Sequence, residues 1–383
     1  ENSIAIEKLN VDVRRNNLLK MISAEILTFD QENLKISSTS SNLIDSTNSL
    51  VMQGIAIANK DQLEVNIDSL ALLGLKDSIY LDSIPAILQD LEEIVLSRPV
   101  IKGKLQGGKG IKLDSSFSLP PLSLTDGQVE LTLATGAVFR SEDFSLKLSQ
   151  GISAKNLTNT LESARFRAND LSYSDSETIL SVGKLSQENR IINILDSRLQ
   201  LPNKTAARID SIRMDGPDFN AWQDDSTITM QSLLVSGIFL NLDSLANKKQ
   251  NSKPKIPAID IAFARFRNLN TTIPLPDQQL KLRNIELDLE NMEWGHSDSL
   301  SSFLAKSSMS LSGPEISYEL KKQNRSVNTG RFIYDDKLRR LTIKDLRTSP
   351  TQTRTEFMIE QAYESDWIVG SSSELIFDDI DFR

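Results

Sequence analysis

The residue pattern closest to a chemical motif is the glycine-rich segment Gly103-Lys104-Leu105-Gln106-Gly107-Gly108-Lys109-Gly110. It approaches GxxxxGK[ST], a loop whose backbone N–H groups hold phosphates and whose final hydroxyl binds magnesium. Here Gly110 takes the place of that hydroxyl residue. The following Ile111-Lys112-Leu113 alternates like a strand where the motif requires a helix. We therefore expect no nucleotide binding and interpret the segment as a flexible hairpin connection.

Adjacent carboxylates are the second candidate for chemistry, and they occur at Asp224-Asp225, Asp335-Asp336 and Asp378-Asp379. Such pairs can bind calcium or serve as the acid and base of glycoside hydrolysis. None has the dense Asp/Asn/Gly spacing of a calcium loop. Asp335-Asp336 falls between two apolar runs, where a turn is expected. We interpret all three pairs as solvated turns, and a glycan-active enzyme stays the third hypothesis because distant carboxylates can converge in space.

The composition leaves few residues for nucleophilic or metal chemistry. The 383 residues include no Cys and a single His, His296. This excludes disulfides, thiolate metal sites and Cys nucleophiles, and it leaves little for a Ser-His-Asp triad or a multi-His site. His296 lies in the polar stretch 294–298, which is typical of a loop, so we assign it a structural or incidental role. We predict no catalytic, cofactor-binding or metal-binding residues.

Charge and hydropathy limit the possible partners. There are 43 Lys plus Arg against 52 Asp plus Glu, a net charge of -9, so counterion release gives no driving force for nucleic acid binding. No apolar run approaches the ~20 residues of a membrane helix, and no charged-then-apolar leader opens the chain. The two ends read as strands, at Ile4–Val11 and Leu375–Phe382. We therefore expect that a signal or anchor, and further strands, were removed from this sequence.

The elements that must position side chains are predicted to be β-strands. Apolar and polar residues alternate with period two through most of the chain. One such run, from Phe117 to Leu124, meets Asp126-Gly127 and resumes at Val129, which predicts a hairpin with a tight positive-φ turn. Helical periodicity is confined to Ile84–Leu91 and Thr355–Tyr363. An all-β fold with a few short helices is the prediction.

A recurrent Asp-Ser dipeptide interrupts this alternation, because the apolar residues on its two sides stand three positions apart. Such a slip would turn every later side chain to the other face unless a bulge absorbed it. We predict recurrent bulges or strand ends that bend the sheet; the alternative is ordinary turns in a Ser-rich protein. The interrupted segments are Ile67–Leu70, Leu81–Ile84, Ile209–Ile212 and Leu242–Leu245, with Leu282–Ile285 and Ile343–Leu346 matching the spacing without Asp-Ser.

Short internal repeats indicate a duplicated unit. Ala164–Arg167 recurs at Ala264–Arg267, and Asp215–Phe219 is echoed by Ser312–Ile316. The order and the similar spacing, about 100 residues, favour an array over unrelated domains.

A polar, lysine- and proline-bearing segment at 247–257 interrupts the array and is interpreted as a basic flexible loop. Its lysines could meet anionic lipid headgroups, although a solvated loop is the preferred interpretation. The predicted division is an N-terminal strand unit at 1–115 with a helix near 84–91, a central repeat at 116–246, the loop at 247–257 and a C-terminal repeat at 258–383. One continuous array is the alternative.

Longer segments carry a resemblance to a known family. In Leu81–Ile101 a short helical stretch leads into a strand that contains Arg98-Pro99, and Asp210–Phe219 repeats the latter half. The end of the chain, from Leu341 through Ser349-Pro350 to Phe382, completes the pattern. This cadence resembles AsmA-like envelope proteins, in particular the large ones of Bacteroidota. The Asp-Ser-apolar pattern is also similar to the O-glycan acceptor pattern of envelope proteins in that group.

The resemblance implies an elongated, strongly curved antiparallel β-sheet, an open groove or β-taco with an apolar inside, as in bridge-like lipid-transfer proteins. We therefore expect a non-enzymatic periplasmic or envelope protein. Its partners would be lipid acyl chains or phospholipid, and membrane or envelope proteins, in lipid transport or outer-membrane homeostasis. The alternative is a structural or interaction subunit with a closed β-sandwich core and no lipid. Inward apolar residues look alike in both, so the sequence leaves the choice open.

Overall fold

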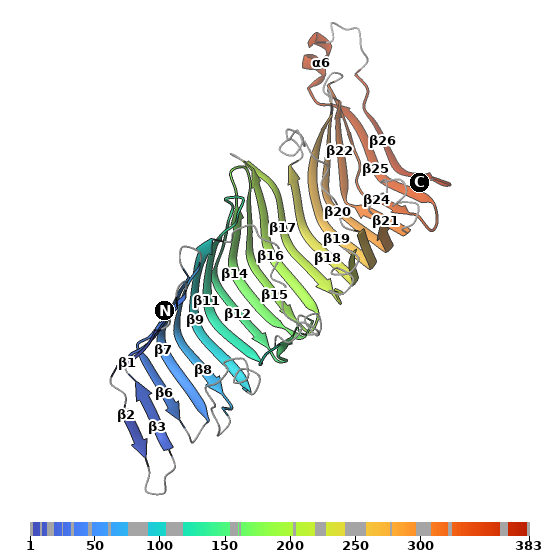
Figure 1. The fold of residues 1–383 in the computed structure, drawn as a ribbon. Coiled ribbons are helices and arrows are strands. Elements are labelled where there is room, and N and C mark those ends of the chain that lie inside the picture. The colour runs from blue at the N-terminus through green and yellow to red at the C-terminus, as the bar shows by residue number, and fades with distance from the viewer. Residues whose placement is uncertain are drawn as a thin grey trace. The chain divides into compact units, whose positions relative to one another are not determined.

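The computed structural model divides the chain into two compact units, Glu1–Arg190 and Ile191–Arg383. Both units are built from β-strands joined edge to edge, which confirms the predicted all-β fold of repeated strand units (Figure 1). The described residues are 3–7, 10–13, 19–24, 26–31, 34–44, 48–59, 63–75, 91–104, 118–153, 160, 162–201, 204–218, 227–241, 258–275, 278–295, 308–320, 324–360 and 367–380.

In the first unit, antiparallel strands follow one another across a sheet, with a single parallel pair, β9 with β11. A separate small sheet joins β10 (Ser118–Leu119) to β13 (Ile152–Ser153). The strands of the large sheet are β1 (Ser3–Glu7), β2 (Asn10–Val13), β3 (Leu19–Ala24), β4 (Ile26–Gln31), β5 (Leu34–Ser38), β6 (Ser40–Ile44), β7 (Ser49–Asn59), β8 (Leu63–Leu73), β9 (Glu93–Lys104), β11 (Leu122–Thr132), β12 (Val138–Leu148), β14 (Arg165–Ser174) and β15 (Ile179–Glu188).

The second unit repeats this plan, again with one parallel pair, β18 with β19. Towards the end of its sheet, shorter strands share a partner: β21 and β22 both pair with β20, and β23 and β24 both pair with β25. Its strands are β16 (Ile191–Leu201), β17 (Lys204–Asp215), β18 (Thr227–Asn241), β19 (Ala258–Leu275), β20 (Gln278–Trp294), β21 (Ser308–Gly313), β22 (Glu315–Leu320), β23 (Arg325–Asn328), β24 (Phe332–Asp335), β25 (Arg340–Pro350) and β26 (Gly370–Phe377).

Two parallel pairs make the sheets mixed, although antiparallel pairing predominates as expected. Two parallel strands need a connection that returns from one end of the sheet to the other, so a tight hairpin cannot join them. The segments in these positions are residues 105–121 and 242–257. They include most of the glycine-rich stretch and the whole lysine-rich stretch in which the sequence pattern breaks. Residues 105–117 and 242–257 lie outside the described part of the chain.

The one multi-turn helix of the described chain is α6 (Arg354–Glu360). It confirms the first part of the helix predicted at 355–363. Thr353 precedes it, and the Thr353 backbone N–H and hydroxyl donate to the Glu356 carboxylate while the Glu356 N–H donates to the Thr353 hydroxyl, a capping box. The Phe357 side chain is fully buried. Of the helix predicted at 84–91, only Leu91 is among the described residues.

A row of interruptions crosses the sheet of the first unit at right angles to its strands. At each position the regular pairing skips a residue, and four of the five skipped residues have a positive φ between 48° and 56°. Because Gly, Asp and Asn enter this left-handed region at least cost, they are the expected residue types. We call the row the first-unit crease; its members are Gly54, Asp68, Arg98, Asp126 and Asp170.

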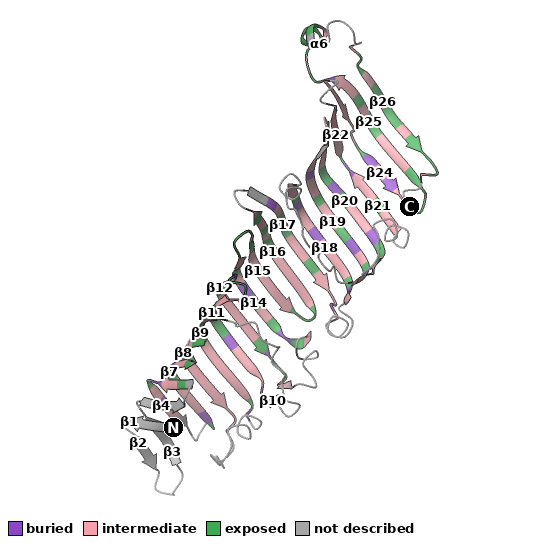
Figure 2. Cartoon of the chain, turned by 45° about the horizontal axis from the view of Figure 1, so that its top comes forward, coloured by how far each residue is buried: buried purple, intermediate pink, exposed green. Residues whose placement is uncertain are grey.

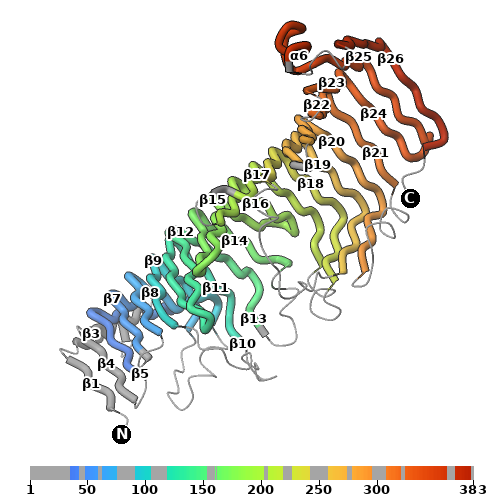
Figure 3. Tube along the Cα trace, turned by 90° about the horizontal axis from the view of Figure 1, so that it is seen from above, coloured from blue at the N-terminus to red at the C-terminus, as the bar shows by residue number. Residues whose placement is uncertain are grey.

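The second unit contains a matching row. Asp196 lies opposite Asp210, which lies opposite Gly237, and the ladder is skipped at all three while its register on either side is unchanged. Figures 1 and 3 show the strands of this unit bending along their length. We call this row the second-unit crease; its members are Asp196, Asp210, Gly237, Asn268, Asn284 and Asp345, of which all but Asp210 have a positive φ.

The crease corrects the predicted hairpin at Asp126-Gly127. Strand β11 runs unbroken from Leu122 to Thr132, and Asp126, with a φ of 53°, lies in its middle. Its pairing with β12 shifts register between Leu124 and Gly127, which defines a β-bulge. Asp-Gly is compatible with both a turn and a bulge because each needs a left-handed residue. Strand β11 pairs with β9 on one side and with β12 on the other, so it continues as one strand through this point.

The same row decides between the two interpretations of the three-residue spacing. Asp68 and Asp210 lie inside strands, as do Asn284 and Asp345, so these segments are bulge-like interruptions rather than turns or strand ends. Residues 81, 82, 242 and 243 fall outside the described chain.

The short sequence repeats occupy unequal positions. Ala164 precedes β14, whereas Ala264 lies inside β19. Gly216 follows the end of β17, and Gly313 ends β21 beside the crease. The repetition in the fold is therefore a repetition of creased strands. The division at 190/191 lies within the predicted central unit, and the three-part domain scheme stays a prediction.

Candidate functional site

One face of each sheet is apolar. The crease preserves this face where the apolar residues of a strand stand three positions apart. Within a strand, alternate side chains point to the same face, and across strands paired residues share a face. Met52 and Ile55 stand three apart across Gly54, and their partners Leu70 and Ile67 do the same across Asp68. The skipped residue therefore places the apolar residues before and after it on the same face of the sheet.

In the first unit this apolar face extends from β7 to β15, because most of its apolar side chains are paired with another on the next strand. We call it the first-unit apolar face. Its members are Leu50, Met52, Ile55, Ile57, Val65, Ile67, Leu70, Leu72, Ile94, Leu96, Pro99, Ile101, Leu122, Leu124, Val129, Leu131, Phe139, Phe144, Leu146, Leu148, Phe166, Ala168, Leu171, Tyr173, Leu180, Val182 and Leu185.

The second-unit apolar face extends from β16 to β26 in the same way. A packed cluster at its centre joins Met230, Ile261, Ala264 and Leu289, with half-buried Leu233, Phe266 and Leu287 among the side chains against it. Its members along the crease are Ile194, Ile209, Ile212, Val235, Ile238, Phe266, Leu269, Leu282, Ile285, Leu311, Ile316, Phe332, Ile343, Leu346 and Leu375.

Several apolar residues that flank the crease are buried. Ala168 and Leu171 flank Asp170 and are both buried, as are Val235 and Ile238 on the two sides of Gly237. The two apolar side chains that flank a skipped residue therefore both pack against the apolar face.

Outside the buried cluster around Ile261 and the buried residues beside the crease, most of the apolar side chains are only half-buried. Figure 2 shows most of each strand as intermediate, with buried residues as isolated patches. Apart from the two-residue strands β10 and β13, every described strand belongs to the large sheet of its unit, and no second sheet of comparable size lies among the described strands. The only described helix of more than one turn, α6, has seven residues. The described chain thus leaves much of its apolar face without a covering layer.

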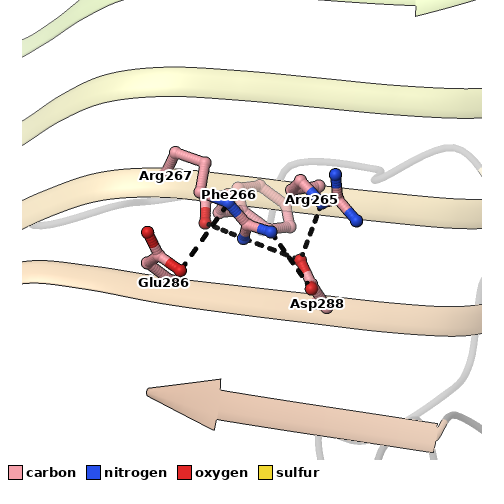
Figure 4. Close-up of polar contacts among 5 residues, drawn as sticks. All are labelled: Arg265, Phe266, Arg267, Glu286 and Asp288. Atoms are coloured by element: carbon pink, nitrogen blue, oxygen red, sulfur yellow. Dashed lines mark hydrogen bonds and ion pairs between the residues drawn. The ribbon is translucent and has the colours of Figure 1, made fainter. Parts of the chain in front are cut away.

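The opposite face is polar and is stabilised by cross-strand ion pairs. The best defined joins β19 to β20: both terminal nitrogens of Arg267 contact the two Asp288 carboxylate oxygens, at 2.7 and 3.1 Å (Figure 4). Arg265 Nε donates to the same carboxylate at 3.2 Å, and Glu286 lies 3.9 Å from Arg267 Nε. Burial pushes the Asp288 pKa upward, but the hydrogen bonds and charges of the two arginines outweigh it and lower the pKa below its ordinary value.

A second carboxylate on the polar face behaves alike. Asp215 accepts hydrogen bonds from Arg213 Nε at 3.0 Å and from the Ser232 hydroxyl at 2.8 Å. Burial again acts to raise the Asp215 pKa, and the hydrogen bonds from Arg213 and Ser232 with the Arg213 charge lower it overall. Both carboxylates are held by arginines, and the contact of Asp288 with Arg267 joins β20 to β19.

The structure describes two of the three predicted carboxylate pairs, and it corrects the prediction of solvated turns at Asp336, whose side chain is buried. Asp335 accepts from the Leu338 N–H and Asp336 from the Tyr334 hydroxyl, in the turn between β24 and β25. Asp378 pairs with Arg340 at 2.6 Å just after β26. Among the described residues, no group of three or more His, Cys, Asp or Glu could hold a metal ion. His296, Asp224 and Asp225 lie outside the described part.

Comparison with known proteins yields no family. No family model matches the chain, and no curated protein matches it either. Among the described helices, none has the length and apolar character needed to cross a membrane. The resemblance to AsmA-like proteins thus stays a prediction.

Sequence reasoning missed most of the crease. Beyond the Asp-Ser sites, the signal was a lone Asp, Asn or Gly between apolar residues three apart, as in Ala168-Asn169-Asp170-Leu171 and Val235-Ser236-Gly237-Ile238. The glycine-rich segment begins at Gly103 and Lys104, which end β9 as ordinary strand residues. The rest of that segment, 105–110, is outside the described residues.

Proposed function

We propose that the apolar faces bind the acyl chains of lipids, and that the protein is a non-enzymatic lipid carrier or conduit of the cell envelope. The observation that carries the proposal is the apolar face of each sheet, much of which is half-buried and has no covering layer among the described residues. Acyl chains suit this surface because moving each methylene out of water is worth about 0.8 kcal/mol and requires no hydrogen-bonding partner. The proposed location in the envelope rests on the resemblance to AsmA-like proteins.

Two adjacent residues of β15 make a matched test. The Leu180 side chain is on the apolar face, as its pairing with Tyr173 shows, and is 42% exposed; Ile179 points to the polar face and is 44% exposed. A photoreactive amino acid at position 180 should crosslink to lipid when the full chain is expressed and purified gently, whereas the same group at 179 should not. Lipid extraction and native mass spectrometry of the unlabelled protein identify the bound species.

A charge at the same two positions gives the complementary measurement. Leu180→Glu should lower the lipid recovered per mole of protein, and Ile179→Glu should leave it unchanged, because only the first places a carboxylate against acyl chains. Equal lipid recovery from both variants, or none from the native chain, would contradict the proposal. A stable protein partner recovered without lipid would instead support the alternative of a structural or interaction subunit.

A further inference from the structure

The polar face of the second unit is hollowed along its crease. A groove of about 1100 Å³ is lined by residues of β17, β18, β19, β20 and β21 and of the connections around β22 to β24, so it crosses the strands rather than following one. Arg208, Phe239 and Asn270 form one cross-strand row of its lining. Their neighbours Ala207 and Leu240 belong to the apolar face, which places the groove on the opposite side of the sheet.

Phe239 is unusual on this face. Its ring is 47% exposed and lies between the polar residues Arg208 and Asn270 on the two neighbouring strands. An exposed aromatic ring with polar neighbours offers a flat apolar surface to a ligand whose rim can hydrogen-bond. The Phe239 side chain points away from the apolar face, so it does not contribute to packing on that face.

The groove also supplies amides for hydrogen bonding. The Asn270 amide is fixed within the protein: its Nδ2 donates to the Asn268 carbonyl, and its Oδ1 accepts from the Asn284 N–H. Asn268 and Asn284 line the groove from left-handed positions of the crease. Each side-chain amide offers two donor hydrogens and an acceptor oxygen, a set that suits hydroxyl groups.

Two arginines and two carboxylates line the groove, and one of the arginines, Arg331, has neither carboxylate as an ion-pair partner. Asp210 is held by Arg208 at 2.9 Å, and Glu286 lies 3.9 Å from Arg267. Arg331, which also lines the groove, has no ion-pair partner among the described residues. The guanidinium of Arg331 is therefore available for an acidic group, which it can bind through two parallel hydrogen bonds.

We propose that this groove binds an acidic saccharide chain, with a sugar ring stacked on Phe239, hydroxyls on the Asn268 and Asn284 amides, and a carboxylate, sulfate or phosphate substituent on Arg331. A peptide is a poorer match, because extended peptides dock on free sheet edges whereas the backbone beneath this groove is paired on both sides. Nucleic acid is disfavoured by a single unpaired cation and by the net charge of -9. The groove lies on the face opposite the proposed lipid surface, so loss of saccharide binding and loss of lipid binding can be measured independently.

The test is calorimetric titration of the full chain with three acidic probes: an oligogalacturonate, a hyaluronan oligosaccharide and a heparin oligosaccharide. At least one should bind saturably, and the methyl ester of the oligogalacturonate should bind more weakly than the acid. Phe239→Ala should weaken binding of the best probe by about tenfold or more, and Arg331→Gln should weaken it similarly while removing any preference for acid over ester. The matched controls are Phe377→Ala, whose phenyl is 44% exposed outside the groove, and Arg167→Gln on the polar face of the first unit; both should bind like the native chain.

Failure of all three probes to bind would overturn the proposal. So would equal affinity of Phe239→Ala, Arg331→Gln and the controls, since binding would then lie elsewhere. Tighter binding of a peptide or an oligonucleotide that Phe239→Ala abolishes would assign the groove to that ligand instead. Circular dichroism of each variant separates loss of binding from loss of fold, and lipid recovery from the Phe239→Ala variant should match that of the native protein.

Discussion

The phenyl ring of Phe144 lies over Gly127, its cross-strand partner: a Cβ on Gly127 would stand 2.6 Å from the ring Cε1. Gly313 and Phe332 repeat the arrangement in the second unit, where the corresponding distance is 2.7 Å. Both pairs lie on the apolar face beside a crease. At these places an aromatic side chain from the next strand covers the backbone that the glycine leaves bare, so the apolar face is not interrupted.

Gly127→Ala should therefore destabilise the first unit. The added methyl group meets the Phe144 ring at less than van der Waals distance, and overpacking of this kind costs about 1–3 kcal/mol. We expect faster amide hydrogen exchange in β11 and β12, measured by mass spectrometry, because an array of strands opens locally before it unfolds as a whole. The double variant Gly127→Ala with Phe144→Leu should recover part of the protection. Unchanged exchange in the single variant would contradict the role assigned to the pair.

Substitutions at Asp170 test the backbone requirement of the crease. The residue has a φ of 50° and an exposed side chain. Asp170→Asn should be nearly neutral, whereas Asp170→Val should cost about 1–2 kcal/mol, because a β-branched residue is strained in the left-handed region. The measurement is the urea midpoint together with hydrogen exchange in β14. Asp170→Gly is the control: it removes the side chain without strain, so a loss as large as that of valine would show that the side chain matters instead.

Asp288 should make stability depend on acid pH. Its folded pKa is below the ordinary value for an aspartate, so the ionised carboxylate contributes stability above the unfolded pKa, and the contribution is lost as pH falls through the folded pKa. Asp288→Asn should cost about 1 kcal/mol at pH 7, a figure reduced for solvent screening because the side chain is 32% exposed. Urea midpoints measured from pH 7 to pH 2.5 should show the native chain and the variant converging below about pH 4.

The control for this prediction is Glu374→Gln, which breaks an exposed pair with Lys344 at 3.5 Å. It should change the midpoint little at any pH. An equal effect of the two variants would mean that the cluster of Arg265, Arg267 and Asp288 has no special role in joining β19 to β20.

The second unit offers its own matched pair for lipid binding. Phe377 pairs with Leu341 on the apolar face and is 44% exposed, while the adjacent Ile376 points to the polar face and is 52% exposed. Phe377→Asp should lower the amount of lipid recovered with the protein, and Ile376→Asp should not. The comparison is made by lipid extraction at equal protein amounts. A drop in both variants would indicate that the end of β26 is disturbed rather than that acyl chains contact Phe377.

Strand content could be predicted because alternation is a local property of the chain. The register slips could also be predicted from the sequence. Asp68, Asp210, Asn284 and Asp345 each lie between apolar residues that stand three positions apart, and each lies in a crease. Asp126-Gly127 shows the limit of local patterns. A turn and a bulge place the same demand on φ, and only the strands on both sides of β11 determine that the chain continues straight.

The groove around Phe239 could not be anticipated in the same way. Its lining comes from positions 208 to 331, which are brought together by pairing across the five strands β17 to β21. No spacing in the sequence links Phe239 to Arg331, because contacts that cross strands depend on register. The parallel pairs β9 with β11 and β18 with β19 were missed for a related reason. The alternation of apolar and polar residues is the same whether the partner strand runs parallel or antiparallel.

The sequence by itself determined that this protein is built from strands, that they slip register at short polar residues, and that one side of each strand is apolar. Those properties follow from side-chain size, polarity and backbone preference, which act over a few residues. The tertiary structure decided that many of the slips align into a crease in each unit, because hydrogen-bond pairing propagates an interruption from strand to strand. It also decided which of the apolar residues become buried, among them Val235 and Ile238 on the two sides of Gly237.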